Sequence, residues 1–183
     1  GRWPDSPSLN LVSGAWLEGF LAGPGLYPRR SPESLESLKV RFPARCREVI
    51  RDAERVRAHR FRLLGSGWFF SVDPARPRRG GYAPLDWALD PVSGLRFPLD
   101  VPHSRWRLEE VRPGRADVKL PWELGRCQHF LPLAQAWTLS RREDFAREIL
   151  LQMQDFMEAN PVGLGVNWAC AMDVAIRALN WAL

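Results

Sequence analysis

Two parts of the chain carry apolar residues at helical spacing, and the first begins near Pro43. Its apolar positions fall on one face, which predicts an amphipathic helix packed on a core. These positions are Cys46, Val49, Ile50, Ala53 and Val56. The arginines of this helix share another face with acidic residues, so we expect these charges to face water. They are Arg47, Arg51 and Arg55.

Another helix start precedes this helix. Ser31 can cap the first free amides of a helix, and Pro32 suits the first helical position, where a missing N–H costs nothing. Residues 1–30 mix Pro, Gly and Ser with isolated apolar residues, so we expect irregular structure with at most one short helix. Residues 1–60 are therefore predicted to form an amino-terminal segment with one or two helices.

The helical period is absent from residues 61–116. Glycine and proline interrupt this stretch every few residues, which predicts an irregular, loop-rich connection. Its short apolar pieces, such as Trp68 to Val72, favour brief strands. The cluster of Arg76, Arg78 and Arg79 could bind an anion, although an exposed flexible loop explains it more simply.

The second periodic part starts at Pro121, which suits the beginning of a helix. The pattern predicts one helix from Trp122 to about Trp137, bent at Pro132 because proline removes an interior hydrogen bond. Its apolar side holds Leu124, Cys127, Leu131 and Ala134.

A further helix is predicted after a Ser-x-x-Glu capping box at Ser140 to Glu143. It runs to about Ala159 and stops at Asn160-Pro161, because a residue before proline is pushed out of the helical region. Its core stripe consists of Phe145, Ile149, Met153 and Phe156.

The last predicted helix starts at Asn167, a natural cap, and runs through Trp181. It is apolar nearly all round, which is typical of a buried helix. Asp173, Arg177 and Asn180 form one polar line on it, and Asp173 is the expected partner of Arg177. Short turns join these helices, so we expect antiparallel packing and a mainly α fold.

Composition allows one sizeable core, with 183 residues of which 45% are hydrophobic. The formal net charge is +5, and almost all the basic residues are arginine. This excess could steer the protein toward an anionic polymer, but the alternation of arginine with acidic residues favours a solvated surface. We expect neither a nucleic-acid nor a membrane partner, because no nucleic-acid-binding motif and no membrane-spanning apolar run is present.

Cysteine spacing also limits the possible sites. Cys46, Cys127 and Cys170 are widely spaced and include no CxxC pair, so they predict buried thiols and neither a disulfide framework nor a zinc site. We expect no metal and no cofactor. The first residues hold no apolar block of the signal-peptide kind. Removal of a signal would imply a periplasmic or extracellular location, and otherwise the location would be cytoplasmic.

Several motifs follow one another along the chain. The strongest are Asp117 to Arg126, then Asn160-Pro161 with Gly165 to Trp168, then Met172 to Trp181. Looser pieces lie at His59 to Gly65 and at Asp86 to Gly94. In this order, over about two thirds of the chain, they resemble the amino-terminal helical domain of heparinase II/III-like polysaccharide lyases.

The resemblance implies a partial (α/α) toroid of antiparallel helix pairs, beginning within residues 117–183, after the irregular Pro- and Gly-rich segment. It also implies a lyase that cleaves uronic-acid-containing polysaccharides by β-elimination. In that reaction a base removes the proton beside the sugar carboxylate, while neutral or cationic groups stabilise the developing charge.

The family assigns the catalytic tasks to an Asn in a Gly-Asn-His motif, a Tyr and a later His. None is present, because the asparagines are followed by Leu, Pro, Trp and Trp, and because Tyr27 and Tyr82 precede the toroid helices. We expect this chain alone to be inactive. We also expect it to be a truncated protein whose open helical surface is covered by missing carboxy-terminal domains or other copies.

Six residues of the predicted helices are expected to contact an acidic polysaccharide. Aromatic rings stack on sugar faces, guanidinium groups bind carboxylate or sulfate, and amides bind hydroxyls. The six are Trp122, Glu123, Arg126, His129, Asn167 and Arg177. Each also has a purely structural interpretation, such as core packing for Trp122 or an i, i+3 ion pair between Glu123 and Arg126.

Two other functions remain open. One is a non-catalytic carbohydrate-binding or surface-polysaccharide-assembly protein on the same scaffold. The other, less well supported, is an Arg-rich nucleic-acid binder, which would need basic residues interleaved with exposed aromatic residues on one face.

Overall fold

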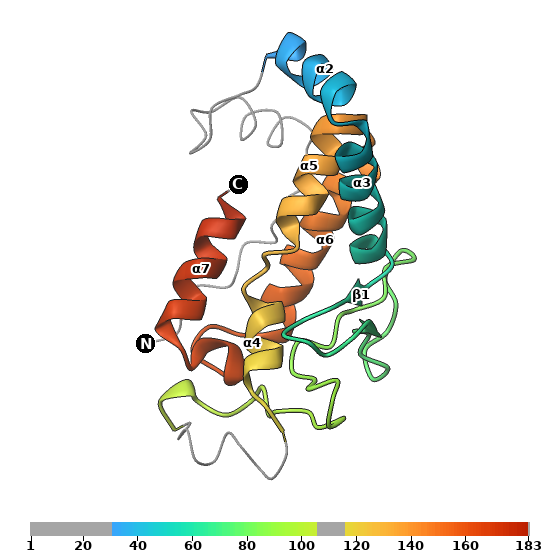
Figure 1. The fold of residues 1–183 in the computed structure, drawn as a ribbon. Helices are drawn as coiled ribbons and strands as arrows, with labels where there is room; N and C mark the ends of the chain where they lie inside the picture. The colour runs from blue at the N-terminus through green and yellow to red at the C-terminus, as the bar shows by residue number, and fades with distance from the viewer. Residues whose placement is uncertain (1–30, 106–115, 183) are drawn as a thin grey trace.

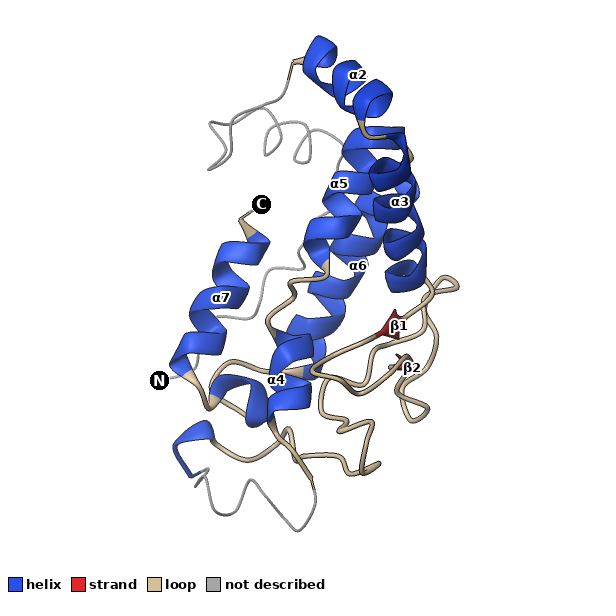
Figure 2. Cartoon of the chain, in the orientation of Figure 1, coloured by secondary structure: helices blue, strands red, loops and turns tan. Residues whose placement is uncertain are grey.

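The computed structural model describes residues 31–105 and 116–182. Within these ranges the chain is mainly helical with one two-stranded sheet, and long loops separate the strands from the later helices (Figure 1 and Figure 2). The predicted mainly α fold is therefore confirmed. The predictions for residues 1–30, and for the part of the loop-rich segment at 106–115, lie outside the described residues.

Both helices predicted after residue 30 are present. α2 spans Pro32–Arg41, and the Ser31 hydroxyl caps it by accepting a hydrogen bond from the backbone N–H of Ser34 at 3.2 Å. α3 spans Pro43–Arg57 and buries its predicted apolar side. Its outer arginines are exposed, as predicted: Arg47, Arg51 and Arg55. Both the helix start and the amphipathic helix are confirmed.

The segment after α3 is largely irregular, but it contains a short hairpin and contributes to the core. Strand β1 (Arg60–Phe61) pairs antiparallel with β2 (Phe69–Phe70), which confirms a brief strand within Trp68 to Val72. Leu85 and Trp87 follow in the loop, are each 1% exposed, and belong to the main hydrophobic core.

A buried aspartate organises the loop that follows. The Asp90 carboxylate accepts hydrogen bonds from the backbone N–H of Val92 at 2.9 Å, the Ser93 hydroxyl at 2.7 Å and the backbone N–H of Asp117 at 3.0 Å. Burial opposes its charge, but these hydrogen bonds together lower the pKa of Asp90. They join this turn to the approach to α4, beyond a 3-10 turn, η1 (His103–Arg105).

The single bent helix predicted from Trp122 to Trp137 is wrong, because the chain forms two helices there. α4 spans Lys119–Gly125 and α5 spans Phe130–Ser140. Cys127 between them has a φ of 57°, a left-handed conformation that interrupts an α-helix. Pro132 lies in the first turn of α5, where its missing N–H removes no helical hydrogen bond. The break also leaves Leu131, predicted on the apolar side, 45% exposed.

α6 spans Glu143–Ala159 and ends at Asn160-Pro161, as predicted. Its predicted core stripe is confirmed, since all four residues pack in the main core: Phe145, Ile149, Met153 and Phe156. The predicted capping box is wrong. Ser140 is still inside α5, where its hydroxyl donates to the Ala136 carbonyl at 2.6 Å, and α6 has no side-chain cap.

The last helix is shorter than predicted. A 3-10 turn, η2 (Val166–Trp168), comes first, and α7 then spans Ala171–Trp181. Asn167 lies within η2, so the prediction that it caps the last helix is wrong. Its side chain instead makes buried hydrogen bonds to Trp87 and Asn160.

α7 also faces the core differently from the prediction of a buried apolar helix. Its buried residues are Asp173 and Arg177, whereas Met172 and Leu179 are 58% and 63% exposed. The polar side turns inward because the neighbouring elements provide hydrogen-bond acceptors and an opposite charge for its side chains. The apolar side of α7 remains open in the described structure.

Helices α3, α5 and α6 lie side by side, and α5 and α6 run in opposite directions as an antiparallel pair (Figure 1). α7 lies beside α4, η2 and part of α5, on the far side from α3. The main core draws on α3, the loop after β2 and the helices from α4 to α6. Its large buried side chains include Trp87, Leu124, Phe130, Leu133, Phe145 and Phe156. Among the described residues no helix has the length and apolar content to cross a membrane.

Candidate functional site

The candidate site lies where α4 and η2 meet α7. Because α4 ends at Gly125, its last carbonyl groups lack partners within the helix. Two side chains of α7 bind carbonyls there: Arg177 Nη1 donates to the Gly125 oxygen at 3.0 Å, and Asn180 Nδ2 donates to the Arg126 oxygen at 2.8 Å. A cation at a helix carboxyl end is also electrostatically favourable. These bonds account for the inward turn of the polar side of α7.

Arg177 is enclosed at this junction, with 3% of its surface exposed. Its Nη2 donates to the Asn167 carbonyl at 3.0 Å, and its guanidinium carbon lies 4.3 Å and 4.9 Å from the ring centres of Phe156 and Trp168. Burial lowers the pKa of Arg177 from its ordinary value. The cation is thus satisfied by carbonyl groups and aromatic faces, and within the described residues it forms no salt bridge.

Arg126 lies between two carboxylates. Its Nε donates to Asp173 Oδ1 at 2.6 Å, and its Nη1 binds the Glu123 carboxylate. Burial works against its charge, but the hydrogen bond to Asp173 and both negative charges together raise the pKa of Arg126. The predicted pairing of Asp173 with Arg177 is therefore wrong, because Asp173 reaches across from α7 to Arg126.

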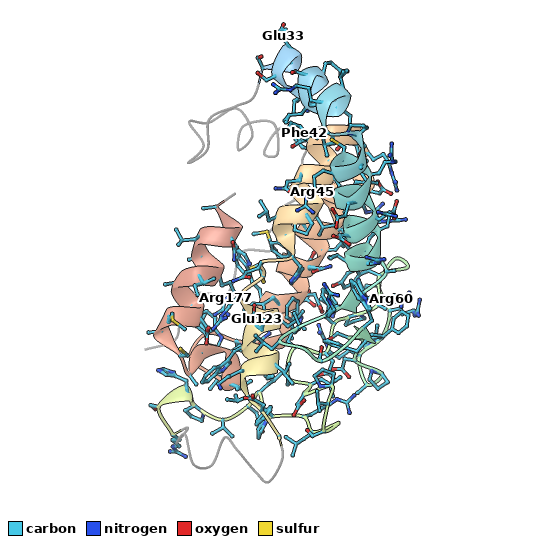
Figure 3. The ribbon with its side chains drawn as sticks, in the orientation of Figure 1. Glu33, Phe42, Arg45, Arg60, Glu123 and Arg177 are labelled. Carbon is cyan, nitrogen blue, oxygen red and sulfur yellow. The ribbon has the colours of Figure 1, made fainter. Side chains whose placement is uncertain are left out.

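The members of this ion cluster differ in their access to solvent. The side chains of Arg126 and Glu123 are 20% and 16% exposed, whereas that of Asp173 is 2% exposed. Asp173 therefore binds Arg126 from the buried side of the junction, and the side of the guanidinium group that faces Glu123 is the side accessible to solvent. Figure 3 labels Glu123, which belongs to α4, and Arg177, which belongs to α7, and these two helices contact each other.

Asn167 supports the same junction from within. It is 1% exposed, and its amide group donates to the Trp87 carbonyl at 2.9 Å and to the Asn160 side-chain oxygen at 2.8 Å. A Cβ atom at position 125 would lie 2.6 Å from Asn167 Oδ1, so Gly125 is required for this close approach. Asn167 thus links the loop before α4 to the end of α6.

Trp122 is half-buried at the edge of the junction. Its indole N–H donates to the Val166 carbonyl at 2.9 Å, and its ring packs against a small second core that includes Phe97 and Val118. Part of the ring still reaches the surface. Trp122 therefore combines the core role considered from the sequence with a partly exposed aromatic ring.

His129 points away from this junction into the main core. Its Nε2 pairs with Gln152 Oε1 at 2.7 Å, and its ring lies 5.0 Å from the ring centres of both Phe61 and Phe130. Burial of the ring lowers the pKa of His129 to about 4, although the residue keeps a little exposed surface. At neutral pH the side chain is therefore uncharged and satisfied inside the fold.

Sequence reasoning missed a buried polar network on α6. Gln152 Nε2 donates to Glu148 Oε1 at 2.7 Å, and His59 Nε2 pairs with the same oxygen at 2.9 Å. One turn further, the Asp155 carboxylate binds several groups of the loop after β2. The signal was present, because positions 148, 152 and 155 follow helical spacing beside the apolar stripe.

The predicted basic cluster belongs partly to this network. Arg76 Nη1 lies 2.6 Å from Asp155 Oδ1, and Arg79 Nη1 lies 2.6 Å from Glu158 Oε2. A shallow pocket with about 350 Å³ of empty volume, part of it open solvent, lies at these residues. Because Arg76 and Arg79 face two carboxylates there, these two arginines attach their loop to α6, whereas Arg78 is exposed.

Five of the six predicted contact residues therefore meet at one junction, and His129 lies apart from them. At the junction, Trp122, Glu123 and Arg126 keep exposed surface, whereas Asn167 and Arg177 are buried behind them. This arrangement can present an oriented guanidinium group, a carboxylate and an aromatic edge to a ligand. In the described residues, no group of three or more His, Cys, Asp or Glu side chains is placed to hold a metal ion.

Comparison with known proteins identifies the family. The family model described as Heparinase II/III N-terminus matches residues 81–182. The chain belongs to the heparinase II/III family. The matched part of this heparinase II/III domain holds the whole α4–α7 junction, and the family relates the protein to polysaccharide lyases. Neither the curated proteins nor the solved structures gave a match.

Proposed function

We propose that the junction of α4 and α7 binds an acidic polysaccharide, with Trp122 and Arg126 in contact with the sugar chain and Glu123 as the carboxylate that the ligand displaces from Arg126. The single observation that carries this proposal is the partly exposed Arg126, held in one orientation by the buried Asp173 at 2.6 Å. An oriented guanidinium group suits the two-point binding of a uronate carboxylate. Family membership makes a polysaccharide the expected ligand.

The buried members of the junction support the contact residues. Arg177 binds the Gly125 carbonyl and Asn167 packs against Gly125, so both fix the end of α4 from which Arg126 projects. The proposed role of Arg177 and Asn167 is to position the contact residues. Such support matters because a binding group must be held within a fraction of an ångström of its working geometry.

The reaction proposed for the heparinase II/III protein is β-elimination of a uronic-acid-containing chain. A base removes the proton beside the carboxylate, the glycosidic oxygen leaves, and a double bond forms in the sugar. Charge develops on the carboxylate, where a guanidinium group such as that of Arg126 would stabilise it. The sequence contains no Asn-His pair of the kind that the family uses for proton transfer. We propose that this chain supplies binding and positioning only.

Binding without catalysis is the second candidate. The specific observation in its favour is the oriented guanidinium group of Arg126, which can bind a sugar carboxylate without any proton transfer. A carbohydrate-binding or polymer-assembly protein would use the same junction. The two candidates are separated by an assay of a protein that also carries the family's catalytic Asn, Tyr and His. A lyase forms unsaturated sugar ends, which are followed by their ultraviolet absorbance, whereas a binding protein forms none.

Glu123 gives the binding proposal a sharp test. Its carboxylate occupies the accessible side of Arg126, so an incoming uronate carboxylate must displace it. Glu123→Gln is therefore expected to tighten binding of a galacturonate oligosaccharide about fivefold, since a competing ion pair of roughly 1 kcal/mol is removed. Arg126→Gln is expected to weaken binding about tenfold. Isothermal titration calorimetry measures both changes.

A matched control exists on α3. Glu48 forms an i, i+3 pair with Arg45 at 2.6 Å, so Glu48→Gln removes the same charge and frees an arginine elsewhere. It is expected to leave affinity unchanged, and a neutral glucan oligosaccharide should respond to none of the variants. Equal tightening by Glu48→Gln and Glu123→Gln would show that overall charge, and not the junction, governs binding.

A further inference from the structure

The β1–β2 hairpin exposes an unusual outer side. Phe61 of β1 is 3% exposed and points into the core, so its neighbours Arg60 and Arg62 point outward. Arg60 lies opposite Phe70 in the strand register, and Phe70 is 64% exposed. Trp68, which precedes β2, is 42% exposed. Large aromatic rings and arginines thus share one face of a short hairpin.

These arginines lie over the aromatic rings. The guanidinium carbon of Arg60 is 5.3 Å from the Phe70 ring centre, that of Arg62 is 5.4 Å from the Trp68 ring centre, and that of Arg55 on α3 is 4.8 Å from the same indole. Such stacking limits the motion of a guanidinium group and leaves its N–H donors available at the edge. We call these five residues the arginine–aromatic surface.

The surface carries uncompensated positive charge. Arg55 forms an ion pair with Asp52 at 2.8 Å, but within the described residues Arg60 and Arg62 form no ion pair with a carboxylate. The sequence from residue 58 to residue 72 contains no Asp or Glu. Arg45, Arg57 and Arg142, by contrast, pair with acidic neighbours, so an external anion meets less competition at the hairpin than at those arginines.

We propose that the arginine–aromatic surface is a second binding site for acidic polysaccharide, separate from the junction of α4 and α7. Its guanidinium edges would bind carboxylate or sulfate groups along the sugar chain. Figure 3 shows Arg60 at one edge of the molecule, away from Glu123 and Arg177. A long polymer held at the hairpin would keep a high local concentration near the junction, as linked binding sites do. The choice of ligand rests on the proposed function.

Nucleic acid fits this surface less well. Single-stranded nucleic acid binds basic grooves by stacking its bases on exposed aromatic faces. Here arginines already lie over the rings of Trp68 and Phe70. A polysaccharide carboxylate needs only the donor edges of the guanidinium groups, which stacking leaves free.

The test measures the affinity of the full chain for immobilised polygalacturonate by surface plasmon resonance. Arg60→Gln with Arg62→Gln is expected to weaken binding about tenfold. Arg60→Lys with Arg62→Lys keeps the charge but loses the planar stacked donors, and it is expected to weaken binding about threefold. Trp68→Ala with Phe70→Ala changes no charge, and it is expected to lower the affinity about as much as the lysine pair does.

Control variants separate this site from general charge and from the junction. Arg47→Gln with Arg51→Gln removes two exposed charges of α3 and is expected to change affinity by less than about twofold. Equal losses in both glutamine pairs would overturn the proposal. It would also be overturned if a single-stranded oligonucleotide bound the hairpin more tightly than polygalacturonate does.

The effect of Arg126→Gln on affinity tests the junction of α4 and α7 independently of the hairpin. If Arg126→Gln has no effect while the Arg60 and Arg62 pair does, the proposed junction fails and the hairpin site stands. If only Arg126→Gln weakens binding, the hairpin proposal fails and the junction stands. Circular dichroism and thermal unfolding confirm that each variant is folded before its affinity is compared.

Discussion

Asp155→Ala is expected to lower the free energy of unfolding by about 4 kcal/mol. Asp155 Oδ2 accepts hydrogen bonds from the Leu85 backbone N–H at 2.8 Å, the Trp87 indole N–H at 2.9 Å and the Tyr82 hydroxyl at 3.3 Å. Its other oxygen pairs with Arg76 at 2.6 Å. Alanine leaves buried donors without an acceptor and a half-buried cation without its carboxylate, and both losses are costly.

Urea unfolding followed by circular dichroism measures this loss. Asp155→Asn keeps one acceptor oxygen but loses the charge, so an intermediate loss of about 2 kcal/mol is expected. Asp52→Ala is the matched control, because the Asp52 side chain is 43% exposed and, among the described residues, its ion pair is with Arg55; it should cost less than about 1 kcal/mol. Similar stabilities for Asp155→Ala and Asp52→Ala would show that the loop after β2 is not held by Asp155.

Arg177→Met is expected to lower the free energy of unfolding by about 3 kcal/mol. Methionine fills similar space but leaves the carbonyl oxygens of Gly125 and Asn167 without their buried donor. Replacing a buried cation with an apolar residue does remove its desolvation cost, which burial of Arg177 imposes in the native protein. The two unsatisfied acceptors are expected to outweigh that gain, because each costs about 1 to 3 kcal/mol.

Urea unfolding followed by circular dichroism also measures the net effect of Arg177→Met on the free energy of unfolding. Arg147→Met on α6 is the control, since Arg147 is exposed, and a change within about 0.5 kcal/mol is expected for it. Arg177→Lys keeps the charge but cannot bind both carbonyls at once, so a loss between those of the two methionine variants is expected. A variant Arg177→Met as stable as the native protein would mean that Arg177 does not hold α7 against α4.

Local signals predicted the helices whose structure depends on nearby residues. Ser31 caps α2, the apolar period fixes α3, and Asn160-Pro161 ends α6, because each signal acts within a turn or two of helix. The break between α4 and α5 was not predictable in this way. It depends on the left-handed conformation of Cys127, a residue type with no preference for that conformation.

The candidate site was likewise predictable only where its structure depends on nearby residues. Helical spacing placed Asp173, Arg177 and Asn180 on one side of the last helix, and the structure confirms that they act together. Their partners come from about 50 residues earlier in the chain, so spacing suggested a bond between Asp173 and Arg177 where the structure has a longer-range one. The exposed apolar side of α7 was missed for a related reason, since burial depends on which side finds partners.

The central claim is that a uronate binds at Arg126 beside Trp122, and side-chain NMR tests it most directly. Arginine Nε–H and tryptophan indole N–H signals are followed while trigalacturonate is added to the protein. The claim predicts progressive shifts of the Arg126 and Trp122 signals, with the indole signal of Trp87, bonded to Asp155 in the core, unchanged. Saturating ligand that moves the Arg60 and Arg62 signals but leaves Arg126 and Trp122 unmoved would contradict it.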